Sequence, residues 1–292
     1  MVEKYGHHKI IHTKEVFTFN EDYLKLDRAK LDAIEFLPIF QPKDLNKDEK
    51  EEIKKMSSAE LDILRYNGFL DNNDIPLNIQ YRYNAFKLRG PEIDQTKPVD
   101  IFLGCSDTFG LAQFENKIWP HIVSSNLETQ YLNLGVPGGS IATCYSALKV
   151  ISSYVKVNRI FLLIPSPYRS QIFFNAPDTV RVMQVGPNFH KVYTRSKEMG
   201  DFAKLIFDKV YSVEETTMIE FDRNLDAIKG LAANHNATFY CTLNPCLPLE
   251  MVDIKLKTHP RDRARDLRHY GKEYQKQIAA YFIEKVNNTE IK

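Results

Sequence analysis

The chain has 292 residues, of which 43% are hydrophobic and 26% are charged. These proportions are typical of a globular protein and exclude a mainly disordered chain. The 39 Lys and Arg residues nearly balance the 38 Asp and Glu residues, so the formal net charge is +1. A charge this small gives no support to bulk electrostatic binding of nucleic acid or of an anionic membrane. We therefore expect a globular protein that binds neither.

The cysteines and the start of the chain indicate the cellular compartment in which the protein is expected. No two of the four cysteines form a CxxC pair; they are Cys105, Cys144, Cys241 and Cys246. A chain of this length needs no disulfides, so we expect reduced thiols. No signal-peptide core follows Met1, and no apolar run reaches the ~18–20 residues of a transmembrane helix. We expect a cytoplasmic or virion-associated protein without a signal peptide or a membrane partner.

The first 95 residues differ in sequence pattern from the rest of the chain and are interpreted as an N-terminal extension of helices and a strand. Residues 21–36 are predicted to form a helix. Ser57 and Glu60 have the spacing of a capping box, which predicts that another helix begins at Ser58. Apolar and polar residues alternate over residues 76–88, which predicts a strand.

A second domain is expected over residues 96–292, where strands and helices alternate. Four short apolar runs have the length of strands, at residues 99–103, 131–134, 159–164 and 237–242. Such continuous runs are typical of a parallel sheet that is covered on both faces. Apolar stripes at helical spacing are interpreted as core-facing surfaces and occur at residues 141–151, 202–210, 225–234 and 272–286. This alternation predicts a doubly wound α/β domain.

Residues with catalytic potential lie just after the predicted strands and before the last helix. In open α/β sheets, sites form at the carboxyl ends of the strands. Ser106 follows the first strand, and a serine needs a base such as histidine to become a nucleophile. Asp266 and His269 are three residues apart, so one turn can place both on one side. Gly138, at a predicted helix start, can direct its backbone N–H at a developing oxyanion.

Three blocks, in this order, resemble those of the SGNH hydrolases, also called GDSL-type esterases and lipases. The blocks are Gly104-Cys105-Ser106, Asn133-Leu134-Gly135-Val136-Pro137-Gly138, and Asp266-Leu267-Arg268-His269 followed by Gly271. The segment Tyr83-Asn84-Ala85-Phe86-Lys87-Leu88-Arg89-Gly90 also resembles the lead-in of some bacterial and phage members. The resemblance implies a flavodoxin-like three-layer α/β/α sandwich with strand order 2-1-3-4-5.

The same resemblance implies the roles of the site residues. Ser106 would be the nucleophile, His269 the general base, and Asp266 the group that orients His269. The N–H groups of Ser106 and Gly138 would form the oxyanion hole. Two departures from the family pattern stand out. Cys105 replaces the family's aspartate, and residues 164–167 lack the asparagine of the third block, for which Ser166 and Arg169 are candidate substitutes.

The function implied is a metal-independent serine esterase without a cofactor that hydrolyses a carboxylic ester on a small molecule or a glycan, with O-acetyl groups as the favoured substrate. Three alternatives stay open. The triad could transfer an acyl group to a sugar hydroxyl, the fold could serve a non-catalytic binding or virion structural protein, or Cys105 could be the nucleophile. The histidines near the N-terminus are interpreted as solvated residues and not as a metal site; they are His7, His8 and His12.

Overall fold

A four-stranded parallel sheet forms the centre of the computed structural model, which describes residues 56–74, 77, 79–176, 179–186, 197–243, 259–265 and 269–290. The central sheet contains β1 (Val99–Gly104), β2 (Tyr131–Gly135), β3 (Val157–Ile164) and β6 (Thr238–Leu243). The strands β4 (Ser170–Ala176) and β5 (Thr179–Val185) form a separate antiparallel hairpin. The sheet has the order β2-β1-β3-β6, and all of its pairings are parallel. The four predicted runs are thus strands, and their order agrees with the first four positions of the predicted 2-1-3-4-5 topology.

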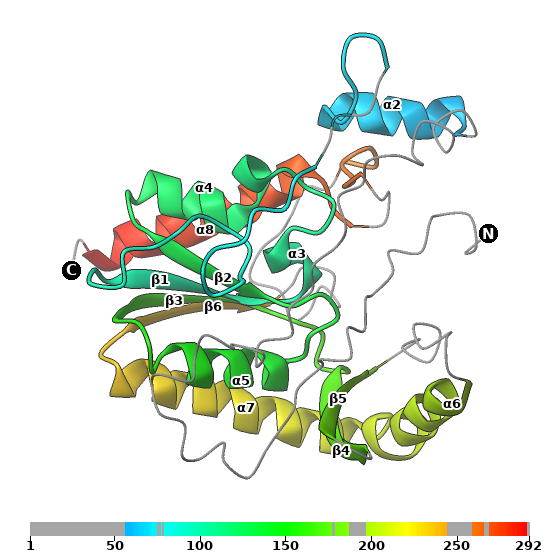
Figure 1. The fold of residues 1–292 in the computed structure, drawn as a ribbon, viewed down its shortest axis with the longest axis vertical. Coiled ribbons are helices and arrows are strands. Elements are labelled where there is room, and N and C mark those ends of the chain that lie inside the picture. Colours follow the sequence, from blue (N-terminus) through cyan, green and yellow to red (C-terminus); the bar gives the residue numbers. More distant parts are fainter. Residues whose placement is uncertain are drawn as a thin grey trace.

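Helices cover both faces of the sheet. The helices are α2 (Ser58–Asn67), α3 (Ser106–Phe109), α4 (Trp119–Asn126), α5 (Ile141–Ile151), α6 (Lys197–Ile206), α7 (Glu214–Asn234) and α8 (Lys272–Glu290), with a 3-10 helix η3 (Glu115–Lys117) and a π-helical turn η5 (Phe207–Tyr211). Helices α4 and α8 lie on one face, and α5 and α7 lie on the other (Figure 1). The fold is therefore the three-layer α/β/α sandwich that the sequence predicts.

The two faces of β1 explain why its sequence is apolar throughout. Side chains alternate along a strand, so Ile101 and Leu103 face the α5 and α7 layer while Phe102 faces α4 and α8. Phe102 stacks on Phe161, and Phe282 of α8 stacks on Trp119. All of these side chains are fully buried. Both layers of the core thus depend on the same four strands.

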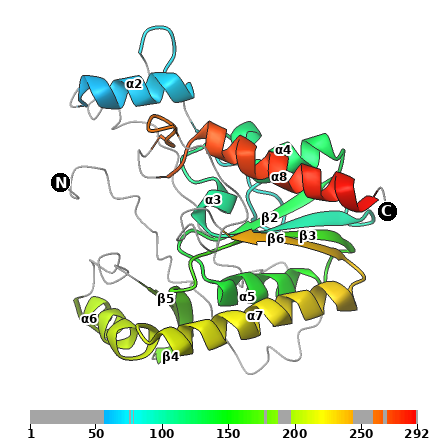
Figure 2. The same cartoon turned by 180° about the vertical axis from the view of Figure 1, so that it is seen from behind.

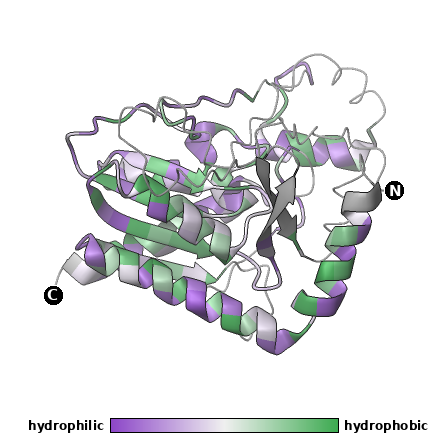
Figure 3. Cartoon of the chain, turned by 60° about the horizontal axis from the view of Figure 1, so that its bottom comes forward, coloured by the Kyte–Doolittle hydropathy of each residue, from purple (hydrophilic) through white to green (hydrophobic). Residues whose placement is uncertain are grey.

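The apolar stripe at residues 202–210 is not the core-facing surface that the sequence predicts. Phe202, Leu205 and Val210 are 39%, 53% and 39% exposed, whereas Ala203 is buried. Helix α6 packs beside the β4–β5 hairpin, where Ala203 meets Val185. Helix α6 does not cover the central sheet, so the apolar side chains on its other side are exposed to solvent. Helices α6 and α7 come forward in Figure 3, and both carry hydrophobic and hydrophilic residues.

The extension is described from residue 56 onward; the helix predicted at residues 21–36 lies outside the described residues. Helix α2 begins as predicted, with a capping box formed by Ser57 and Glu60. The strand predicted over residues 76–88 is wrong, because the described part of this segment forms only an isolated bridge between Tyr83 and Arg89. The predicted alternation of burial occurs where the segment is described, since Ile79 and Tyr81 are buried while Gln80 and Arg82 are exposed. The segment is an amphipathic extended chain that packs on the domain without joining a sheet.

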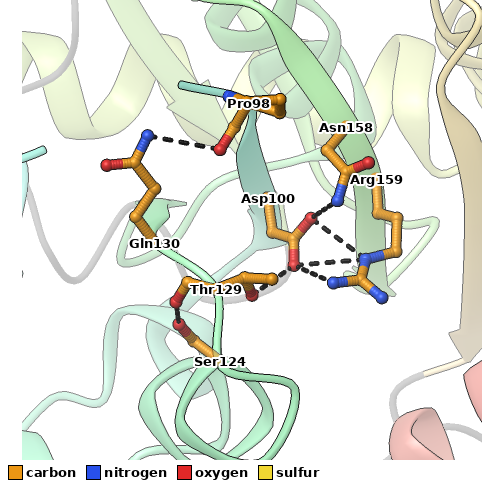
Figure 4. Close-up of polar contacts among 7 residues, drawn as sticks. All are labelled: Pro98, Asp100, Ser124, Thr129, Gln130, Asn158 and Arg159. Carbon is orange, nitrogen blue, oxygen red and sulfur yellow. Dashed lines mark hydrogen bonds and ion pairs between the residues drawn. The ribbon is translucent and has the colours of Figure 1, made fainter. Parts of the chain in front are cut away.

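At the amino ends of the strands, a buried ion pair joins β1 to β3 (Figure 4). Arg159 donates from Nη2 to Asp100 over 2.9 Å, and Asn158 and Thr129 donate to the same carboxylate over 2.9 and 2.7 Å. A shallow hollow of about 480 Å³ lies beside this network and is lined by Lys97, Pro98, Glu128, Thr129, Gln130 and Asn158. The network is at the opposite end of the sheet from Ser106.

Among the described helices, none combines the length and the apolar character that crossing a membrane requires.

Candidate active site

Ser106 is the first residue of α3, directly beyond the carboxyl end of β1 (Figure 1). The turn depends on Gly104, whose φ of 154° is rare for other residues. A Cβ on Gly104 would lie 2.0 Å from Thr108 Oγ1 and 2.9 Å from the carbonyl oxygen of Leu163. A glycine here lets the chain turn back tightly above the strand ends. We call residues 104–113 the Ser106 turn.

Asn133 and Gly135 of β2 hold the Ser106 turn in place. Asn133 Nδ2 donates to the carbonyl oxygen of Thr108 over 2.9 Å, and Asn133 Oδ1 accepts the N–H of Gly135. The backbone of α3 lies so close to β2 that a Cβ on Gly135 would be 2.2 Å from the nitrogen of Phe109. The Asn-x-Gly pattern of the second block thus has a structural reason: it seats the turn that carries Ser106.

The polar groups of Ser106 are available for chemistry. Ser106 is 8% exposed, and neither its hydroxyl nor its N–H has a hydrogen-bond partner among the described residues. The N–H belongs to the peptide unit of Cys105, whose carbonyl accepts the N–H of Phe109 over 2.9 Å. Phe109 in turn shares a peptide unit with the Thr108 carbonyl that Asn133 binds. Hydrogen bonds in such a chain polarise one another, which strengthens the N–H of Ser106 as a donor.

Gly138 lies in the loop between β2 and α5, near the carboxyl end of the sheet. Its φ of 77° favours glycine, and the N–H of Gly139 closes the loop on the carbonyl of Val136 over 2.8 Å. Ser140 caps α5 through Thr143. Within the described part of the chain, no acceptor binds the N–H of Gly138. The group therefore remains a candidate oxyanion donor.

His269 lies in a loop that is closed by a short antiparallel bridge. We call residues 259–271 the His269 loop; Asp266 falls outside the described residues. The bridge pairs Arg263 with Tyr270, and the N–H of Ala264 donates to the carbonyl of His269 over 2.9 Å. His269 itself is half-buried.

Asp262 fixes the junction between the His269 loop and α8, a role that the sequence did not reveal. Its carboxylate accepts the N–H groups of Glu273 and Tyr274 over 3.0 and 2.7 Å, so it caps the helix. Gly271 is needed beside it, because a Cβ there would lie 2.3 Å from Asp262 Oδ1. Asp262 precedes α8 by ten residues. Because cap signals are sought only at the position next to a helix, the sequence pattern does not indicate Asp262 as a cap.

Three hydrogen bonds join the Ser106 turn to the His269 loop and α8. Gln113 Nε2 donates to the carbonyl of Tyr270 over 3.0 Å, and the N–H of Arg265 donates to the carbonyl of Ala112 over 3.1 Å. Gln275 Nε2 donates to the carbonyl of Asp107 over 3.1 Å. The structure thus brings together the two segments that carry Ser106 and His269. It shows no hydrogen bond between these two side chains, and their pairing stays a prediction.

The remaining candidates of the site differ in accessibility. Ser166 and Arg169, in the loop after β3, are both half-buried, and the N–H of Arg169 donates to the carbonyl of Ser166. Cys105 is 2% exposed, which disfavours it as a nucleophile. Burial raises the pKa of the neighbouring Cys144 thiol. The cysteines that the structure describes form no disulfide bond, as expected. Cys246 lies outside the described residues.

No family model matches the sequence, and no curated protein matches it. Solved structures with similarity include two of the lipolytic G-D-S-L family. The first, from Desulfitobacterium hafniense DCB-2, has 14% identity and a TM-score of 0.32, with 64% of this chain and 99% of that chain covered. The second, from Veillonella parvula DSM 2008, has 14% identity and a TM-score of 0.30, with 64% and 97% covered.

A third similar structure is an acetyl xylan esterase from the rumen bacterium Butyrivibrio proteoclasticus, with 12% identity and a TM-score of 0.33. The match covers 68% of this chain and 65% of that chain, so this chain spans about two thirds of that protein's length. The first two structures carry the name of the family that the sequence blocks resemble. The fold class of this chain rests on its own sheet topology.

Proposed function

We propose that the protein is a serine hydrolase that cleaves a carboxylic ester, with Ser106 as the nucleophile. One observation carries the proposal. Ser106 stands at the carboxyl end of β1 with a hydroxyl and an N–H that no described residue binds, while the segment that carries His269 is hydrogen-bonded to its turn. A nucleophile and an oxyanion donor in one turn, with a base arriving from a second segment, is the arrangement that acyl transfer needs.

The proposed reaction is a double displacement. Ser106 Oγ attacks the ester carbonyl carbon as His269 accepts the hydroxyl proton, and Asp266 stabilises the imidazolium. His269 then gives the proton to the leaving alcohol, which leaves an acyl group on Ser106. Water attacks this second ester with His269 again as the base, and the carboxylic acid departs. The N–H groups of Ser106 and Gly138 stabilise both tetrahedral oxyanions.

This chain departs from the family pattern at the position of the third oxyanion donor. The family's asparagine is absent from the loop after β3, and removal of one such donor costs about 10²–10³ in rate. Ser166 and Arg169 are the polar residues that this loop offers in its place. We propose that one of them supplies the donor.

The favoured substrate is an O-acetyl group on a glycan, a proposal that rests on the resemblance of the sequence blocks. An acyltransferase would use the same acyl-enzyme and pass the acyl group to a sugar hydroxyl, so it would show transfer with an acceptor and little hydrolysis without one. A non-catalytic binding or virion structural protein would leave Ser106 unlabelled by a fluorophosphonate. A cytoplasmic or virion-associated location remains part of this proposal.

The first test compares hydrolysis of p-nitrophenyl acetate by the wild type and by Ser106→Ala. We expect kcat/KM to fall about 10³-fold or more in the variant, because removal of a triad nucleophile leaves only binding and oxyanion stabilisation. Cys105→Ala is the matched control: it changes the adjacent buried side chain and should retain activity. Circular dichroism confirms that each variant is folded.

Two results would contradict the serine mechanism. Equal rates for the wild type and Ser106→Ala would exclude Ser106 as the nucleophile. Loss of activity in Cys105→Ala together with retained activity in Ser106→Ala would assign the reaction to the thiol. If no protein hydrolyses the reporter, a fluorophosphonate decides: labelling of the wild type but not of Ser106→Ala supports the proposal, and absence of labelling supports a binding protein.

A further inference from the structure

The described part of the N-terminal extension contacts both segments that would form the active site. Figures 1 and 2 show α2 at the same end of the sheet as α3, on the side of α8. The following extended chain, up to Arg89, packs against the Ser106 turn. Its apolar contacts form one buried cluster with Phe109 and Leu111 of that turn.

Arg89 binds the Ser106 turn from inside the protein. Its side chain is buried, and it donates to the carbonyls of Phe109, Gly110 and Gln113 over 2.8, 2.5 and 2.6 Å. The peptide units of Phe109 and Gly110 also contain the N–H groups of Gly110 and Leu111, both of which donate to the carbonyl of Ser106. The guanidinium is therefore linked to Ser106 through two peptide units.

The charge of Arg89 is stabilised by dipoles and aromatic rings. No carboxylate pairs with it among the described residues. Its guanidinium carbon lies 4.6 Å from the ring centroid of Tyr81 and 5.3 Å from that of Phe109. Burial holds the pKa of this guanidinium below its usual value. A buried cation that binds three carbonyls of one turn rigidifies that turn.

Asn67, the last residue of α2, binds the His269 loop. Its side chain is 6% exposed, and Nδ2 donates to the carbonyl of Arg261 over 2.6 Å and to that of Ile63 over 2.9 Å. At the other end of the loop, a Cβ on Gly271 would lie 2.6 Å from Asn67 Oδ1. Asn67 therefore contacts the loop on both sides of His269. Beside it, Lys272 Nζ donates to the carbonyl of Tyr66 over 2.6 Å.

Ala112 is the point where the three segments meet. Its N–H donates to Tyr81 Oη over 2.9 Å, and its carbonyl accepts the N–H of Arg265. The guanidinium of Arg265 returns to the extension, where it donates to the carbonyl of Leu77. Ala112 has a φ of 57°, which is strained for an alanine and persists where surrounding contacts impose it.

We propose that residues 57–74, 77 and 79–89 form a clamp that sets the placement of the Ser106 turn relative to the His269 loop, with Asn67 and Tyr81 as positioning residues. This inference rests on the proposed function for its catalytic consequence. The clamp bonds backbone groups of the segments that carry the Ser106 hydroxyl and the His269 imidazole. It acts by fixing the two backbones that carry them, and a shift of about 1 Å in such a pair costs about 10²-fold in rate.

The kinetic test uses Asn67→Ala and Tyr81→Phe. We expect kcat for p-nitrophenyl acetate to fall at least about tenfold in Asn67→Ala and about threefold or more in Tyr81→Phe, with KM within about twofold of the wild type. A merely structural role would lower the melting temperature and leave kcat unchanged at a temperature where the variant is folded. Arg65→Ala is the control, because Arg65 lies on the same helix and pairs only with exposed acids.

Hydrogen exchange separates failure of the clamp from failure of the proposed function. We expect Asn67→Ala to accelerate exchange in the His269 loop and in the first turn of α8 about tenfold or more, with β1 and β3 unchanged, whether or not the protein is an esterase. An active wild type whose Asn67→Ala and Tyr81→Phe variants keep full kcat would overturn the clamp. An inactive wild type with unchanged exchange in Asn67→Ala would overturn both proposals, and accelerated exchange would leave the clamp standing without the esterase.

Discussion

Burial sets the protonation of His121 on α4. The ring is half-buried, and its Nδ1 has no hydrogen-bond partner. It approaches Tyr131 edge to face, with 6.2 Å between ring centroids. Desolvation holds the pKa of His121 below its ordinary value of 6.5, because a charged imidazolium loses hydration there. The folded protein therefore binds this proton more weakly than the unfolded chain does.

From this shift we predict that the protein loses stability as the pH falls from 7.5 to 5.5. Near pH 6.5 the unfolded state binds more protons at His121, so the free energy of unfolding decreases as the pH decreases. His121→Gln cannot titrate and should show a smaller decrease. Melting temperatures of both proteins across this range provide the check. Parallel curves for the two proteins would mean that His121 contributes nothing to the pH dependence.

At the residue scale, local sequence patterns predicted where two candidate site residues lie in the fold, and their catalytic roles stay predictions. Ser106 and Gly138 lie at the strand and helix ends where the blocks predicted them. Asn67 and Asp262 were not predicted as structural elements of the site, because nothing near them in the sequence indicates their partners. Asn67 binds a carbonyl 194 residues away. A contact of that kind is a property of the folded chain alone.

At the scale of elements, the contact between α3 and β2 decides whether the Ser106 turn can form. Helix α3 has only four residues, too few to be stable alone. It is held by Asn133 on one side and by Arg89 on the other, and it lies directly on Gly135. The absence of a side chain at Gly135 is what permits this approach.

Two glycine substitutions should therefore have opposite effects. Gly135→Ala places a Cβ against the backbone of Phe109, so we expect a loss of about 1–3 kcal/mol in stability and about 10²-fold in kcat/KM. Gly230→Ala in α7 meets no atom within 4 Å and should stabilise the protein by about 0.5–1 kcal/mol with unchanged activity. Urea unfolding and ester hydrolysis measure the two effects. Full activity in Gly135→Ala would show that the turn tolerates displacement.

Elements were predicted well where burial and periodicity agree. The four strands of the sheet and the helices at residues 141–151, 225–234 and 272–286 occur where the patterns placed them. The prediction of a strand over residues 76–88 failed, because an extended chain that packs on a protein surface alternates like a strand, yet the described part of this one pairs only through the Tyr83–Arg89 bridge. The prediction that the stripe at residues 202–210 faces the core failed because α6 packs beside the β4–β5 hairpin. Such a helix has the same apolar periodicity as a helix that packs on the central sheet.

For the whole molecule, the ion pair between Asp100 and Arg159 ties the two central strands at their amino ends. The side chains of Asp100 and Arg159 are 0% and 10% exposed. Breaking such a pair by removing one partner leaves an uncompensated buried charge, which costs about 3–5 kcal/mol. Replacing both partners removes that cost.

We accordingly predict that Arg159→Met lowers the free energy of unfolding by about 3–5 kcal/mol, and that the double variant Asp100→Leu with Arg159→Met recovers most of this loss. Urea unfolding of the two single variants and the double variant gives the coupling. Hydrolysis by the folded variants should stay near that of the wild type, because the pair is at the far end of the sheet from Ser106. A double variant that loses the sum of the single effects would refute the coupling.

The hydrogen bonds that join the two halves of the candidate site also determine when this site can form during protein synthesis. Gln113 and its partner Tyr270 are 157 residues apart, and Asp107 and Gln275 are 168 apart. At about 5–20 residues per second, a ribosome needs roughly 10 to 30 s to pass from the first partner to the second. At the start of that interval the nascent chain contains Ser106 and α2, and His269 is added only just before it ends. The proposed site can therefore be assembled only after residue 275 has been made.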